Sequence, residues 1–214
     1  STVVRWAFAM LLVGTVVPAW GQGAPKAAEP KSAQQALDAH GLVDQVTQDV
    51  LGVVANNKTT IKDNPEKYYA EVSKVLEPVV AFDYIAKVVM AQYYKSATDK
   101  QRDAFATTFT QSMVETFAKG MANYSDFEIT VQPPEGDISD QRKVEVLQEV
   151  KTNDGKHIVS YTMAKARTGE WKLINVVLNG INLGKSFRDQ FTQAASQQSG
   201  DIDKVIATWG QSAQ

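Results

Sequence analysis

Few residues of this chain have the type and spacing that catalysis requires. The sequence contains no cysteine and two histidines, His40 and His157, so it offers no thiol nucleophile, no disulfide and too few ligands for a typical zinc site. It also lacks a Gly-x-Ser-x-Gly nucleophile elbow. Asp83 could serve as a general base if it were buried beside an apolar pocket, but its position suits a helix cap equally well. The residue types therefore define no catalytic constellation.

A second candidate motif, Gly180 followed by Gly184-Lys185-Ser186, resembles a phosphate-binding loop. That loop requires four residues between its two glycines, because the intervening backbone N–H groups form the cradle for the phosphates. Here only three residues separate the glycines. The sequence therefore gives no support for nucleotide binding.

Composition narrows the classes of partner. The 214 residues are 43% hydrophobic and 21% charged, which suits one globular domain, and the formal net charge is -2. A nucleic-acid-binding protein usually carries a basic face, so we expect no nucleic-acid partner. The chain also shows no compact cluster of arginine and lysine.

The first residues predict export. Arg5 precedes an apolar run that ends at Pro18, and Ala19-Trp20-Gly21 places small residues where a signal peptidase reads them. An N-terminal membrane anchor is the alternative, but this run is shorter than the roughly 20 apolar residues of a membrane span. We therefore expect a cleaved signal peptide at residues 1–21, a flexible leader at 22–33 and a single domain at 34–214.

The first half of that domain reads as helices. Residues 34–57 place apolar side chains at helical spacing, Asn64-Pro65 predicts a helix start, and Pro78 ends or kinks that helix. Thr98 and Gln101 fit a capping box before a longer helix. Apolar residues spaced by four follow in that helix: Phe105, Phe109, Met113, Phe117 and Met121.

The second half reads as an antiparallel meander followed by helices. Residues 127–131, 143–150 and 157–167 alternate with period two and are separated by turn residues. Trp171–Leu178 is apolar on both faces, with Trp171, Leu173 and Val177 predicted on one side and Val176 on the other. The predicted fold class is α+β, with N-terminal helices, a twisted antiparallel sheet of about four strands and C-terminal helices.

Several segments together give a resemblance to a known family. They are Leu76-Glu77-Pro78, Phe82-Asp83-Tyr84-Ile85-Ala86, Ala97-Thr98-Asp99-Lys100-Gln101, Trp171-Lys172-Leu173, Gly180-Ile181-Asn182-Leu183 and Phe187-Arg188-Asp189-Gln190-Phe191. In this order and spacing they resemble the MlaC family, also called the toluene-tolerance auxiliary family. Asn175 stands where that family commonly has Asp, and Ala91 and Tyr94 stand where Gly and Trp are frequent.

The resemblance implies a function. Members of the MlaC family are soluble periplasmic proteins that hold phospholipid acyl chains in an apolar cavity between the sheet and the helices. They carry lipid between an outer-membrane lipoprotein and porin complex and an inner-membrane ABC transporter with its substrate-binding-domain subunit, which maintains outer-membrane lipid asymmetry. By this resemblance we expect a periplasmic phospholipid shuttle that is not an enzyme and uses no cofactor or metal.

The expected wall of the cavity comes from three parts of the chain. The early helices would supply Leu76, Val79, Phe82, Ile85 and Val89; the long helix would supply Phe105, Phe109, Met113 and Phe117; and the sheet would supply Val146, Tyr161, Met163, Val177 and Ile181. Because no basic cluster would select a headgroup, we expect the tails to be bound and the headgroup to lie near solvent. The junction at Pro78 and Asp83 interrupts a helix, and it is either the most movable part of the wall or a static kink that only redirects the chain.

Two other functions fit the same pattern. A cavity between a sheet and helices could belong to an enzyme acting on a small hydrophobic substrate, with Asp83 as its base. A periplasmic chaperone or adaptor that binds protein in place of lipid is the other possibility.

Overall fold

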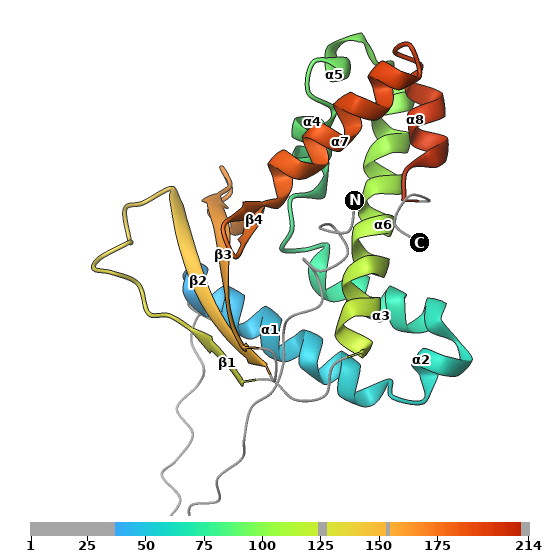
Figure 1. Ribbon diagram of the computed structural model, residues 1–214. Helices are drawn as coiled ribbons and strands as arrows, with labels where there is room; N and C mark the ends of the chain where they lie inside the picture. Colours follow the sequence, from blue (N-terminus) through green and yellow to red (C-terminus); the bar gives the residue numbers. More distant parts are fainter. Residues whose placement is uncertain (1–36, 124–127, 153–154, 211–214) are drawn as a thin grey trace, which may run out of the picture.

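The computed structural model describes residues 37–123, 128–152 and 155–210 (Figure 1). The predicted signal peptide and leader, residues 1–33, lie outside the described residues. No helix among those described is long and apolar enough to cross a membrane. The described elements are α1 (Ala39–Asn56), α2 (Thr60–Asp63), α3 (Pro65–Leu76), α4 (Phe82–Met90), α5 (Tyr93–Ser96), α6 (Asp99–Ala122), β1 (Glu128–Val131), β2 (Lys143–Thr152), β3 (Gly155–Lys165), β4 (Trp171–Leu178), β5 (Ile181–Asn182), α7 (Leu183–Gln197) and α8 (Ile202–Thr208).

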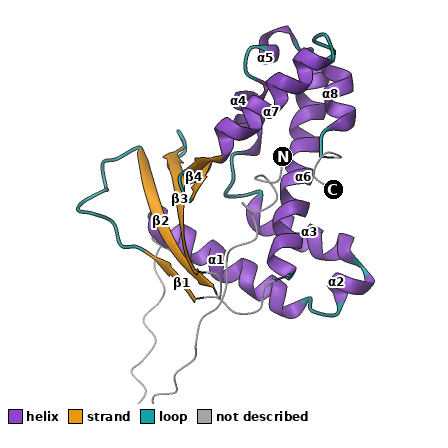
Figure 2. Ribbon diagram, viewed as in Figure 1, coloured by secondary structure: helices purple, strands orange, loops and turns teal. Residues whose placement is uncertain are grey.

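The strands form one antiparallel sheet in the order β1-β2-β3-β4-β5, and the fold is α+β as predicted (Figure 2). Each strand pairs with the next along the chain, so the sheet is a simple meander. Figure 1 shows α1 running along the sheet, while α4, α6, α7 and α8 form a separate bundle of helices at one side. The predicted sheet of about four strands lacked β5.

Strand β5 follows a two-residue hairpin turn made by Asn179 and Gly180. Both residues have positive φ, 48° and 81°, which is the conformation that a type I′ turn demands. Leu178 and Ile181 close the turn as paired residues. The Asn-Gly pair is the usual sequence signal for such a turn.

Local sequence signals fix several helix ends. Asn64 accepts a hydrogen bond from the Lys67 N–H at 3.2 Å, with Pro65 in the first turn of α3. Thr98 and Gln101 form the predicted capping box of α6, with hydrogen bonds of 3.0 and 3.2 Å.

The prediction that Asp83 caps a helix is wrong. Helix α4 begins one residue earlier, at Phe82, and Ala81 occupies the cap position with no side-chain hydrogen bond. The reason is a tertiary contact, because the backbone of Val79 and Ala81 is held by Leu173 of β4.

The helical bundle is held by a cluster of aromatic side chains. The Phe105 ring lies 4.7 Å from the Phe191 ring and 5.1 Å from the Trp209 ring, measured between centroids, and both pairs meet edge to face. Phe109 and Phe187 make a similar contact at 5.7 Å. These contacts join α6, α7 and the end of α8, and they fix the helices that form one side of the cavity described below.

Candidate functional site

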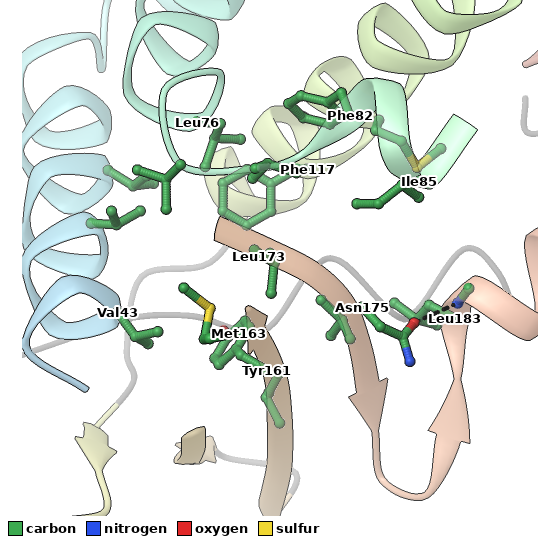
Figure 3. A pocket seen from close by; sticks show the side chains of 18 of the residues that line it. Val43, Leu76, Phe82, Ile85, Phe117, Tyr161, Met163, Leu173, Asn175 and Leu183 are labelled. Carbon is green, nitrogen blue, oxygen red and sulfur yellow. Dashed lines mark hydrogen bonds between the residues drawn. The ribbon is translucent and has the colours of Figure 1, made fainter. Parts of the chain in front are cut away.

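An apolar cavity of about 160 Å³ lies between the sheet and the helices (Figure 3). Helices α1, α3, α4, α6 and α7 and strands β3 and β4 all contribute to its wall. The lining residues are Val43, Val46, Thr47, Val50, Leu76, Val79, Val80, Phe82, Ile85, Phe109, Met113, Phe117, Met121, Val159, Tyr161, Met163, Leu173, Asn175, Val176, Leu183, Gly184 and Phe187. None of these side chains is charged.

Most of the residues predicted to form the site lie in this wall. Those that line the cavity are Leu76, Val79, Phe82, Ile85, Phe109, Met113, Phe117, Tyr161 and Met163. Asp83, the candidate general base, is exposed and lies outside the lining.

The other predicted residues lie elsewhere. Val89 and Phe105 are fully buried in the cluster that joins α4, α6 and α7. Val146 is fully buried in a cluster that joins α1 and the sheet. Val177 is half-buried outside the lining, and Ile181 is 42% exposed on β5. Their apolar character reflects packing in the first three cases, which periodicity cannot distinguish from a cavity wall.

A β-bulge explains why Val176, and not Val177, lies in the wall. Met163 pairs with Leu173, but Thr162 pairs with Asn175, so Ile174 is an extra residue in β4. Beyond the bulge the alternation is shifted by one residue, and Val176 stands opposite Tyr161. Leu173 and Val176 therefore both line the cavity, although strict alternation predicts them on opposite faces.

Sequence reasoning missed the contribution of α1. Val43, Val46 and Val50 line the cavity from this helix, together with Thr47. The signal was present, because these residues form the apolar stripe of an amphipathic helix. Nothing in the periodicity shows whether such a stripe covers a cavity or a solid core.

Three side chains bring polar atoms to the cavity wall: Thr47, Tyr161 and Asn175. The Tyr161 hydroxyl donates to Gln148 Oε1 at 2.8 Å, Gln148 Nε2 donates to Thr47 Oγ1 at 3.0 Å, and Thr47 donates to the Val43 carbonyl at 2.7 Å. Burial raises the pKa of the Tyr161 hydroxyl well above its usual value, so this hydroxyl stays protonated at neutral pH. This network pairs the hydroxyl groups of Tyr161 and Thr47 with other groups of the protein.

Asn175 ties the sheet to the start of α7. Its Oδ1 accepts a hydrogen bond from the Gly184 N–H at 3.1 Å, while Asn182 caps the same helix by accepting from the Lys185 N–H at 3.0 Å. A Cβ atom at residue 184 would lie 2.5 Å from Asn175 Oδ1. Only glycine therefore fits at this contact without a shift.

The junction between α3 and α4 is also tied to the sheet. The Leu173 N–H donates to the Val79 carbonyl at 2.9 Å, and the Ala81 N–H donates to the Leu173 carbonyl at 3.0 Å. Lys172 Nζ also donates to the Pro78 carbonyl at 2.5 Å. The helix is interrupted here, as predicted, but movement of this junction away from β4 would break backbone hydrogen bonds.

The fold and the site together define a class of protein. An open antiparallel sheet and a layer of helices enclose a cavity with an uncharged, almost wholly apolar lining, and such a site suits an apolar ligand held by burial. Among the described residues, no group of three or more histidine, cysteine, aspartate or glutamate side chains could hold a metal ion.

Comparison with known proteins places the chain within a family. Residues 44–211 match the family model described as MlaC protein, so the chain belongs to the MlaC family and the resemblance is confirmed. The chain is 36% identical over 185 residues to a protein of Pseudomonas putida named toluene tolerance protein ttg2D, covering 86% of this chain and 85% of that one.

A more distant relative and a solved structure agree. The chain is 25% identical over 175 residues to the intermembrane phospholipid transport system binding protein MlaC of Haemophilus influenzae, with 80% of each chain covered. Its fold resembles a phospholipid-binding protein of Ralstonia solanacearum, solved in complex with a phospholipid, with a TM-score of 0.70 and 22% identity. That match covers 80% of this chain and 98% of the other, and it shows the fold.

Proposed function

We propose that this protein binds phospholipid by enclosing its acyl chains in the cavity between the sheet and the helices. The uncharged apolar lining is the observation that carries the proposal, because acyl chains offer no polar group for recognition. Burial of each methylene contributes about 0.8 kcal/mol. Support also comes from the name of the Haemophilus influenzae relative, a phospholipid transport system binding protein, and from the phospholipid bound to the Ralstonia solanacearum protein of similar fold.

The proposed role is that of a shuttle that carries phospholipid between the two membranes of the cell envelope and so maintains the lipid asymmetry of the outer membrane. Its partners would be an inner-membrane ABC transporter complex and an outer-membrane lipoprotein and porin complex. The cellular location would be the periplasm, reached through the signal peptide proposed at residues 1–21. We propose no enzymatic activity, since none of the described residues in the lining carries a carboxylate, imidazole or amine.

The size of the cavity bears on how lipid is loaded. A volume of about 160 Å³ holds on the order of ten water-sized groups. Two acyl chains of ordinary length contain roughly thirty methylenes, each about as large as a water. We therefore propose that the walls move apart when the acyl chains of a phospholipid are loaded.

Transfer between vesicles tests the shuttle. The purified protein should move a fluorescent phospholipid from donor to acceptor vesicles at a rate that rises in proportion to protein concentration. Because burial is non-directional, several headgroup classes should be transferred. Transfer no faster than the spontaneous exchange in protein-free vesicles, by protein shown to be folded, would contradict the proposed function.

A further inference from the structure

Where α1 faces β3, the lining residues follow one another in three steps along the two elements, apolar at both ends and polar in the middle. At one end, Val43 of α1 and Met163 of β3 belong to the same apolar cluster. At the other end, Val50 of α1 and Val159 of β3 belong to a second cluster. Thr47 and Tyr161 occupy the step between them, since each lies between the two apolar residues on its own element.

Tyr161 stands at the boundary of these two clusters. Among the described residues, it is the one half-buried apolar or aromatic side chain that packs against both of them. Its ring also lines the cavity, where it lies on the floor formed by the sheet (Figure 3). The ring therefore contacts both apolar clusters and the cavity between the sheet and the helices.

The position of this ring is fixed by hydrogen bonds. The Tyr161 hydroxyl is held by Gln148, whose side chain is fully buried, and Gln148 is held in turn by Thr47 on α1. Rotation of the side chain about its Cα–Cβ bond would leave the buried Gln148 oxygen without this donor, which is unfavourable in an apolar surrounding. An acyl chain cannot form a hydrogen bond with these polar groups. We therefore assign the network to holding the ring in place, and not to contact with the lipid.

We propose that Tyr161 divides the sheet side of the cavity into two grooves, one for each acyl chain of a diacyl lipid. One groove would run along the side of the ring where Val43 and Met163 lie, and the other along the side where Val50 and Val159 lie. Gln148 and Thr47 would act as positioning residues that hold the ring between the chains. This inference rests on the proposed phospholipid-binding function. It names Tyr161 as the residue that determines the preference for diacyl lipids over single-chain lipids.

The divider has a measurable consequence for selectivity. Both chains of a diacyl lipid would contact the ring, one on each side, whereas a single-chain lysolipid would contact one side and leave the other groove unfilled. Without the ring the two grooves merge, so a diacyl lipid loses wall contacts on both chains, and a single chain can move into the space that the ring occupied. Removing the ring should therefore weaken diacyl binding more than lysolipid binding.

The test compares two substitutions in the delipidated full-length mature protein. Tyr161→Leu removes the ring, and Tyr161→Phe keeps the ring while removing the hydroxyl. Dissociation constants for dioleoyl phosphatidylglycerol and for oleoyl lysophosphatidylglycerol are measured by displacement of a fluorescent phospholipid. We expect Tyr161→Leu to lower the preference for the diacyl lipid on the order of tenfold, and Tyr161→Phe to change it less than about threefold.

Three outcomes decide between the explanations. A preference for the diacyl lipid that stays unchanged in Tyr161→Leu would overturn the proposal that the ring divides the cavity, while leaving lipid binding intact. A wild-type protein that binds neither lipid would overturn the proposed function, and the divider with it. If Tyr161→Leu fails to fold because Gln148 is left unpaired, the double variant Tyr161→Leu with Gln148→Leu removes that group, and the same expectation applies to it.

Discussion

A charge placed on the cavity wall should abolish lipid binding without unfolding the protein, and strand β4 offers a matched pair of positions for this test. Val176 lines the cavity opposite Tyr161, and the adjacent Val177 lies outside the lining opposite Ser160. The two variants Val176→Asp and Val177→Asp introduce the same group at neighbouring residues of one strand. We expect the first to lose phospholipid and the second to keep it.

The size of the effect follows from the absence of charge in the wall. No lining side chain can pair with a carboxylate, so an aspartate at residue 176 must be protonated when acyl chains surround it. Protonating a carboxyl of ordinary pKa near 3.9 costs about 4 kcal/mol at pH 7 and about 1.5 kcal/mol at pH 5. Affinity should therefore fall about a thousandfold at pH 7 but only about tenfold at pH 5.

Displacement of a fluorescent phospholipid at both pH values gives these affinities, and circular dichroism checks that each variant is folded. Lipid binding favours the protonated form of the new carboxyl, so the affinity of Val176→Asp should recover as the pH falls. Loss of binding in Val177→Asp together with normal binding in Val176→Asp would refute the assignment of the β-bulge and of the cavity face.

Three further predictions concern stability and pH. Gly184→Ala should lower the free energy of unfolding in urea by about 1–3 kcal/mol, because the new Cβ atom would clash with Asn175 Oδ1. In a double-mutant cycle, Asn175→Ala should remove most of this loss, and additive effects of the two substitutions would argue against the contact. Ala91 has a φ of 49°, which disfavours every residue with a Cβ, so Ala91→Gly should raise the free energy of unfolding by about 1 kcal/mol, and a lower melting temperature would contradict this. Lipid retention should stay constant between about pH 6 and pH 9, since Tyr161 is the one titratable group among the described residues of the lining and burial raises its pKa; a loss of retained lipid near neutral pH would contradict this. Burial likewise raises the pKa of Tyr68 to about 12, so the stability that these neutral hydroxyls contribute is present below the ordinary tyrosine pKa near 10 and is lost only in strong alkali.

The parts of the fold that were predictable from sequence depend on contacts between near neighbours. Asn64 with Pro65, and Thr98 with Gln101, place the starts of α3 and α6 correctly because each cap is formed within three residues. The start of α4 was misplaced at Asp83, because the preceding backbone is fixed by Leu173, about ninety residues further along the chain.

The cavity wall was harder to predict for a related reason. The stripe on α6 reads as a continuous row, yet Phe109 lines the cavity while Phe105 packs among other rings. The difference depends on where α7 and α8 cross the helix, which the spacing of the stripe does not contain. The extra residue at Ile174 had the same effect on β4, because alternation of apolar side chains carries no mark of a bulge when both faces are apolar.

Mass spectrometry of the organic extract tests the central claim most directly. The protein is produced with its export signal in a Gram-negative host, purified without detergent or added lipid, shown to be folded by circular dichroism, and extracted with organic solvent. The proposed function predicts phospholipid in an amount comparable to the protein, with headgroups that mirror the composition of the host membranes. Folded protein that repeatedly yields no phospholipid would contradict it.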